Sequence, residues 1–319
     1  MSVKLSVIAG VLVAAAGTLR AGAPPRAPEP PAAAPAQAPA FDAARAWTHL
    51  EQLVEIGPRP AGSPGIRQTR AYITRQLSDM GLTVQEQAFT QATPRGDIEF
   101  VNLVVRLEGR RPGKILLTGH YDTKPFEEFA FVGANDGGSS GAFLIELARV
   151  LKDRPREFTW ELVWFDGEEA FCFDWYECGK PGAPDNTYGS RHYVRAARDA
   201  GALDQLRAMI LVDMIGGRGA RFQRESESTD WLKDIIWGTA HELGHAAMFP
   251  NTETPITDDH YPFLEAGVDA VDIIDLDGYM PWWHTAGDTM DKLSAQSMGA
   301  VGEVLVASLP KIEAHLRAQ

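Results

Sequence analysis

The spacing of apolar residues alternates along the chain between a helical and a strand-like period. Apolar positions three and four residues apart are typical of amphipathic helices, and they predict helices at 41–56, 66–80, 142–151, 188–200, 230–243 and 293–316. Two segments alternate like an antiparallel strand pair, 82–89 and 98–107, with Gly96-Asp97 in the turn. Short continuous apolar runs predict buried strands at 114–119, 158–165, 208–214 and 270–274.

This succession of strands and helices predicts the α/β class, as a three-layer sandwich with helices on both faces of a mixed, mostly parallel central sheet. Ligands of such sheets bind outside the carboxyl ends of the strands. His120, Glu168, Glu169 and Asp213 each end or follow a predicted central strand. We therefore expect these four side chains to share one active site.

The first 23 residues have the pattern of a secretory signal peptide. Lys4 precedes an apolar run, 5–16, which has the length of a signal core and is too short to span a membrane comfortably. Ala21-Gly22-Ala23 fits a cleavage site, but the following Pro24 disfavours cleavage. We expect residues 1–23 to be a signal peptide, or alternatively an uncleaved membrane anchor, of a protein exported to the periplasm or secreted.

The rest of the chain divides into a linker and one catalytic domain. Residues 24–40 are almost wholly Pro and Ala and predict an extended linker, so the domain spans 41–319. With 45% hydrophobic residues, the chain supports a sizeable core. The net charge of −13 argues against nucleic-acid binding, which needs a basic face, and gives no reason to expect an anionic membrane as partner.

The chain has two cysteines, Cys172 and Cys178, in a loop rich in glycine and proline. Two thiols are too few for a metal–thiolate site. Because we expect export, and disulfides persist in oxidising compartments, we expect a small disulfide-closed loop. Two free thiols are the alternative.

Glu168 and Glu169 stand directly after the buried strand predicted at 158–165. Two carboxylates at the mouth of a buried strand are costly to desolvate, and a metal ion is the usual compensation. One carboxylate is then a ligand and its neighbour a general base. The alternative is a solvated loop that carries the pair by chance.

Zinc binds His and carboxylate ligands, and a catalytic site leaves one position open. The candidate ligands are His120, Asp136, Glu169, Asp213 and His284. We expect Asp122 to hold the His120 ring, and His260 to be a structural hydrogen-bonding residue. Trp175, Trp282 and Trp283 are candidates for an apolar rim, with Trp283 favoured because it adjoins His284.

Six motifs together resemble the zinc-dependent glutaminyl cyclases of the animal type, within the superfamily of zinc aminopeptidases. The similar region runs from about Phe41 to the C-terminus, and the motifs are His120-Tyr121-Asp122-Thr123, Gly133-Ala134-Asn135-Asp136-Gly137, Asp166-Gly167-Glu168-Glu169-Ala170-Phe171, Tyr188-Gly189-Ser190-Arg191-His192, Asp258-Asp259-His260-Tyr261-Pro262-Phe263 and Trp283-His284-Thr285. The loop 172–186 is longer than this family leads us to expect, and its cysteines do not match the family's usual disulfide positions.

The resemblance implies a single catalytic zinc held by Asp136, Glu169 and His284. It implies that Glu168 shuttles a proton. It also implies that Asp213 and Asp258 form a hydrogen-bonded carboxyl network near Glu168.

The resemblance also implies a pocket for a glutamine side chain, lined by Trp283, Trp175 and Tyr279. The implied partners are peptides or proteins with N-terminal glutamine, and we expect the protein to be a monomer. The glutamine α-amine would attack its own γ-carbonyl, which zinc would polarise, to give pyroglutamate and ammonia.

Two other functions remain open from the sequence. A two-zinc aminopeptidase would use Asp136 as a bridge and place the second ion on His120 and Asp213. Glu168 would then activate a water. A non-catalytic binding module on a degenerate peptidase fold is the other, although the full set of ligands and base argues against it.

Overall fold

The computed structural model describes residues 39–180 and 182–319, with scattered positions before residue 18. The expected signal peptide and most of the expected linker lie outside the described residues. Contacts divide the chain into Met1–Gln37 and Ala38–Gln319, and the described helices and strands belong to the second unit. Among the described residues, no helix combines the length and apolarity needed to cross a membrane.

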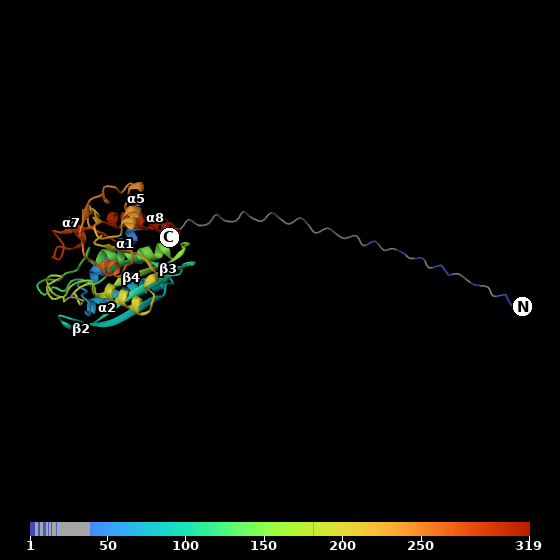
Figure 1. Cartoon of the computed structure of the whole chain (residues 1–319), viewed down its shortest axis with the longest axis horizontal. Coiled ribbons are helices and arrows are strands. Elements are labelled where there is room, and N and C mark those ends of the chain that lie inside the picture. The colour runs from blue at the N-terminus through green and yellow to red at the C-terminus, as the bar shows by residue number, and fades with distance from the viewer. Residues whose placement is uncertain are drawn as a thin grey trace. The chain divides into compact units, whose positions relative to one another are not determined.

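A six-stranded mixed sheet forms the centre of this unit (Figure 1), in the order β1-β2-β4-β3-β5-β8. The strands are β1 (Val84–Thr93), β2 (Gly96–Leu107), β3 (Arg111–His120), β4 (Phe158–Phe165), β5 (Leu206–Asp213) and β8 (Ala270–Ile274). β1, β2 and β4 pair antiparallel, and β4, β3, β5 and β8 pair parallel. The four parallel strands therefore bring their carboxyl ends to one edge.

Helices cover both faces of the sheet, because successive strand residues point to opposite sides. On one face, Ile115, Leu117 and Ile210 belong to the main core, together with α1 (Ala43–Ile56), α2 (Pro64–Asp79), α3 (Gly138–Leu151), α5 (Asp230–Glu242) and α8 (Ala295–Ala318). α8, drawn in red, packs against α1, drawn in blue (Figure 1).

On the other face, Leu116 and Met209 form a second core with α4 (Tyr188–Asp199) and α6 (Tyr261–Glu265). The expected three-layer α/β sandwich is thus confirmed.

The predicted elements agree with the structure within a few residues, and the differences have local causes. α3 begins at Gly138 rather than at 142, directly after the glycine turn. The β1–β2 turn is Pro94-Arg95, because Gly96 already pairs with Thr93. Short elements without a periodic pattern went unpredicted: the strand pair β6 (Arg224–Glu225) and β7 (Glu253–Thr254), the helices α6 and α7 (Leu276–Tyr279), and the 3-10 turns Leu203–Gln205 and Met290–Lys292.

The buried side chain of Arg59, between α1 and α2, fixes the loop that follows β3. Its guanidinium donates to the carbonyl oxygens of Tyr121 at 2.8 Å, Val132 at 2.6 Å and Gly133 at 2.7 Å. Burial lowers the pKa of Arg59 to about 10, so the group stays charged at neutral pH. The loop that it holds carries Asp136.

Replacing Arg59 with methionine tests this contribution. R59M leaves several buried carbonyls without a donor, each worth ~1–3 kcal/mol, so we expect the free energy of unfolding in urea to fall by about 3 kcal/mol or more. R59K keeps the charge but loses the planar guanidinium, so its free energy of unfolding is expected to lie between those of the wild type and R59M. R67M, at an exposed arginine, is the control. An unchanged urea midpoint for R59M would contradict the role.

Candidate metal and catalytic site

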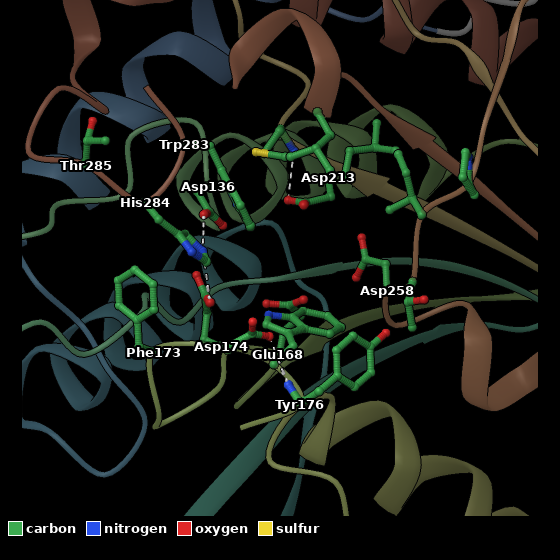
Figure 2. A pocket seen from close by; sticks show the side chains of 18 residues that line it. Asp136, Glu168, Phe173, Asp174, Tyr176, Asp213, Asp258, Trp283, His284 and Thr285 are labelled. Atoms are coloured by element: carbon green, nitrogen blue, oxygen red, sulfur yellow. Dashed lines mark hydrogen bonds and ion pairs between the residues drawn. The ribbon is translucent and has the colours of Figure 1, made fainter. Parts of the chain in front are cut away.

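A cavity of about 660 Å³ lies where the parallel strands end, and Figure 2 shows the side chains around it. β3 ends at His120 and β5 at Asp213, while Glu168 and Glu169 follow β4. The structure thus confirms that these side chains meet at the carboxyl edge of the sheet.

Two tight turns deliver the carboxylates. Gly137 follows Asp136 with φ of +72°, and a Cβ there would lie 2.2 Å from the carbonyl oxygen of Asp122. Gly167, between β4 and Glu168, has φ of +75°, and a Cβ would lie 2.3 Å from the Phe100 ring. Only glycine fits either position without displacing its neighbours.

Three side chains meet at one end of the cavity. Asp136, Glu169 and His284 each offer one ligand atom, and these atoms lie within 4.8 Å of one another. His284 Nε2 is 3.4 Å from Asp136 Oδ2 and 3.2 Å from Glu169 Oε2. Asp136 Oδ2 and both carboxylate oxygens of Glu169 are buried without a hydrogen-bond partner in the described part of the chain. Such oxygens are costly unless a cation compensates them, so this cluster fits a metal ion.

The protonation of this cluster indicates the same demand for positive charge. Burial lowers the pKa of His284, but the negative charges of Glu169 and Asp136 outweigh it and raise the pKa to about 9. Burial raises the pKa of Asp136, but His120 and His284 bring it below its usual range. A metal ion and a histidine proton are two ways to meet this demand.

A second cluster shares Asp136 with the first, since His120, Asp136 and Asp213 also offer atoms within 4.8 Å of one another. His120 Nε2 lies 3.0 Å from Asp213 Oδ1 and 3.3 Å from Asp136 Oδ1. His120 Nδ1 lies 3.4 Å from Asp122 Oδ1. Both ring nitrogens therefore have carboxylate partners, whereas Asp136 Oδ2 and both Glu169 carboxylate oxygens of the first cluster lack a hydrogen bond in the described part of the chain.

Asp122 contacts residues of both clusters. In addition to facing the His120 ring, its carboxylate accepts the N–H groups of Glu168 at 3.2 Å and Glu169 at 3.4 Å. The expectation that Asp122 orients His120 is confirmed, and the contacts to the Glu168–Glu169 backbone were not anticipated.

Glu168 lines the cavity with a buried side chain. Burial raises the pKa of Glu168 well above its usual value, although the nearby His120 opposes this, and the charges of Glu169 and Asp258 raise it further. A carboxyl group that holds a proton so readily is suited to proton transfer.

Asp213 and Asp258 both line the cavity, but they do not form the expected hydrogen bond to each other. Asp213 Oδ1 accepts from His120 and from the Met214 N–H, at 3.0 and 2.7 Å. Asp258 Oδ2 has no partner within the described ranges. Burial and the charge of Asp213 raise the pKa of Asp258 to about 7, so the two acids interact through charge rather than through a shared bond.

His260 lies outside the cavity lining and is fully buried. Its Nε2 is 3.1 Å from Glu225 Oε2, and its Nδ1 is 3.9 Å from Asp272 Oδ2. The expectation that His260 has a structural role is confirmed.

Two of the three tryptophans expected at the apolar rim line the cavity, and the third does not. Trp175 and Trp283 line the cavity, and the Trp283 ring stacks on the His284 ring with centroids 4.0 Å apart. Trp282 is 39% exposed and lies outside the lining, with Lys292 over its ring.

Tyr279 is not where the resemblance implies. Its side chain is buried behind the cavity wall, because its hydroxyl donates to Asp288 Oδ1 at 2.8 Å. The prediction that Tyr279 lines the substrate pocket is therefore corrected: its hydroxyl anchors Asp288.

Asp288 is the most important residue that the sequence did not reveal. Its carboxylate accepts the N–H groups of Asn135 at 2.8 Å and Asp136 at 3.1 Å, so it holds the backbone of a candidate ligand. Its position four residues after His284, in the same loop, was the available signal. His284 itself has φ of +52°, an uncommon conformation for a residue with a side chain, of the kind found at functional sites.

Lys124 was also missed, and no sequence pattern marks it. Its buried ammonium donates to the carbonyl oxygens of Ala170 and Cys172, both at 3.0 Å, and lies 3.9 Å from Glu169 Oε2. It thereby connects the candidate ligand to the loop that follows. In this loop Cys172 and Cys178 form the expected disulfide.

The chain is similar to proteins named as glutaminyl cyclases. A glutaminyl cyclase structure from an Acidobacteriales bacterium is 35% identical, with a TM-score of 0.80 over 88% of this chain and 99% of that one. The glutaminyl-peptide cyclotransferase-like protein of Bos taurus is 28% identical over 299 residues, covering 84% of this chain and 76% of its own.

A leucine aminopeptidase precursor from Bacteroides thetaiotaomicron is 27% identical, with a TM-score of 0.76 over 85% of this chain and 98% of that one. The sequence model of peptidase family M28 matches residues 102–309, from β2 into α8. Because that match spans more than half of the chain, the protein belongs to peptidase family M28.

Proposed function

We propose that this protein is a glutaminyl-peptide cyclotransferase, which converts N-terminal glutamine of peptides to pyroglutamate and releases ammonia. The observation that carries the proposal is that one cavity contains both a buried acid, Glu168, and carboxylate oxygens of Asp136 and Glu169 that lack a hydrogen bond. The relatives named glutaminyl cyclases, which cover most of this chain, support it.

We propose Zn²⁺ as the metal. Two carboxylates and one imidazole match the ligand types of catalytic zinc sites, which keep a fourth position open. Asp136, Glu169 and His284 would hold the ion, and it would supply Lewis-acid polarisation of a carbonyl oxygen. One ion is favoured, because the buried carboxylate oxygens that lack a hydrogen bond belong to this cluster, while both nitrogens of His120 already face carboxylates.

The chain's own groups perform the proton transfers in this proposal. Glu168 takes a proton from the glutamine α-amine while the new nitrogen–carbon bond forms at the γ-carbonyl. It then gives the proton to the amide nitrogen, which leaves as ammonia when the old carbon–nitrogen bond breaks. Asp213 and Asp258, on the same cavity wall, share the negative charge and modulate the proton affinity of Glu168.

Trp175 and Trp283 meet the remaining requirement, which is to hold the substrate in a bent conformation. Nucleophile and electrophile belong to the same residue, so the barrier falls mainly when the side chain is bent back into contact. Two tryptophan walls around the glutamine side chain favour this bent form and exclude water, which would otherwise hydrolyse the amide.

The competing activity is that of a two-zinc aminopeptidase. The cluster of His120, Asp136 and Asp213 provides a place for a second ion, and the resemblance to a leucine aminopeptidase precursor is in the same range as that to the cyclases. In that case Glu168 activates a water and the product is a free amino acid.

We further propose that the domain at 41–319 works outside the cytoplasm as a monomer. The disulfide Cys172–Cys178 supports the location outside the cytoplasm, since such bonds persist in oxidising compartments. A signal peptide or anchor at 1–23 and a linker at 24–40 remain part of the proposal.

The product of the reaction separates the two activities. Zinc-loaded protein is incubated with a short peptide that begins with glutamine, and mass spectrometry follows the peptide. We expect loss of ammonia with every residue retained, and no reaction after chelation. Release of the first residue would contradict the cyclase and indicate the aminopeptidase.

Substituting the proposed proton shuttle tests its role. E168Q keeps the shape but cannot accept the amine proton, so we expect kcat to fall by about 10²–10⁴-fold while the zinc content stays unchanged. E128Q, at an exposed glutamate, is the matched control and should retain full turnover. If E168Q kept the wild-type kcat, Glu168 would not be the shuttle.

Substituting one ligand tests the metal cluster. H284A removes the only neutral ligand of the three, and we expect most of the zinc to be lost on dialysis against a weak chelator, measured by elemental analysis. H245A, at a histidine paired with Glu303 away from the cavity, should keep its zinc. Equal zinc retention in both variants would place the ion elsewhere.

A further inference from the structure

We propose that the disulfide-closed loop Cys172–Cys178 is the binding site for the second residue of the peptide, and that it selects a large apolar side chain there. The inference rests on the proposed function, because it names the peptides that the cyclase prefers. Four consecutive residues of this loop, Phe173 to Tyr176, line the cavity. We call the segment 172–178 the aromatic ring-loop.

The cavity is larger than one glutamine residue requires. Trp283 and His284, beside the candidate metal ligands, line this cavity together with Phe173 and Tyr176. In Figure 2 the Phe173 ring lies toward His284 and the Tyr176 ring toward Asp258. A peptide whose first residue reaches Glu168 therefore has its second residue next to the aromatic ring-loop.

The two outer aromatics are unusually exposed. Phe173 is 83% exposed and Tyr176 is 72% exposed, which makes them the most exposed large apolar side chains described between residues 39 and 319. Single exposed apolar residues are ordinary, but two in one short loop that lines a cavity are typical of a binding surface. An apolar partner that covers both rings would remove this surface from water.

Hydrogen bonds fix the backbone of the aromatic ring-loop. Cys172 N–H donates to Asp185 Oδ2 at 2.9 Å, and Asn186 donates to the Trp175 carbonyl at 3.2 Å. Inside the loop, the Glu177 carboxylate accepts the N–H groups of Phe173 and Asp174 at 3.1 and 3.3 Å.

The disulfide closes these seven residues on themselves. A short closed loop with its backbone bonded in this way restricts the backbone that carries the aromatic rings. The surface is thus formed before the peptide arrives, which lowers the entropy lost on binding.

Part of the remaining lining is apolar as well. Pro255 and Ile256, after β7, and Leu276, in α7, line the same cavity. A large apolar second side chain could contact these residues as well as the aromatic ring-loop. A charged side chain would have to give up water at this apolar surface.

The test compares three peptides, Gln-Gly-Ala, Gln-Phe-Ala and Gln-Lys-Ala amides, on the zinc-loaded full chain. We expect kcat/KM to be about tenfold or more higher for Gln-Phe-Ala than for Gln-Gly-Ala. In the double variant F173S/Y176S this ratio should fall toward one. L243S replaces an exposed leucine outside the cavity and should keep the wild-type ratio.

A second variant tests the closed loop. C172S/C178S opens the loop, and we expect a smaller preference for Gln-Phe-Ala, mainly through a higher KM, with zinc content and melting temperature measured in parallel. A wild-type enzyme without preference, one that prefers Gln-Lys-Ala, or an F173S/Y176S variant with the wild-type ratio would overturn the inference. Failure to cyclise any of the three peptides would instead overturn the proposed function, and the inference with it.

Discussion

The concentration of buried negative charge at one edge of the sheet is the constraint on which the rest of the site depends. Many carboxyl groups are buried there or directly behind it, among them Asp122, Asp136, Asp166, Glu168, Glu169, Asp213, Asp258, Asp259, Asp272 and Asp288. Charges that leave water must be neutralised, by a proton or by a cation. The structure shows the first response in the raised pKa of Glu168 and Asp258. The unpaired oxygens of Asp136 and Glu169 indicate the second.

The surrounding protein holds these acids together against their mutual repulsion. Asp122 binds the backbone of both glutamates, Asp288 binds the backbone of Asp136, and Arg59 fixes the loop on which Asp136 stands. Each contact acts on the main chain, so the carboxylate oxygens stay free for a ligand. The supporting groups therefore do not occupy the carboxylates that face the cavity. Those carboxylates provide two of the metal ligands, Asp136 and Glu169, and the proton shuttle, Glu168, of the proposed reaction.

Apolar periodicity was sufficient to predict the central strands and their ends, because a buried strand is a short apolar run and parallel strands end at one edge. That placed His120, Glu168, Glu169 and Asp213 correctly. Asp288 and Arg59 escaped prediction, because their importance depends on backbone groups that are far apart in the sequence. Tyr279 was misplaced for a related reason: a motif position does not show that its hydroxyl reaches Asp288 rather than the cavity.

The central claim is that the buried acids are organised around a metal ion. Crystals of the zinc-loaded protein, measured on both sides of the zinc absorption edge, test it directly. The account predicts an anomalous peak about 2 Å from a carboxylate oxygen of Asp136, from one of Glu169 and from Nε2 of His284. An empty cluster in which these groups are protonated and bonded to one another, or zinc bound only at another place, would contradict it.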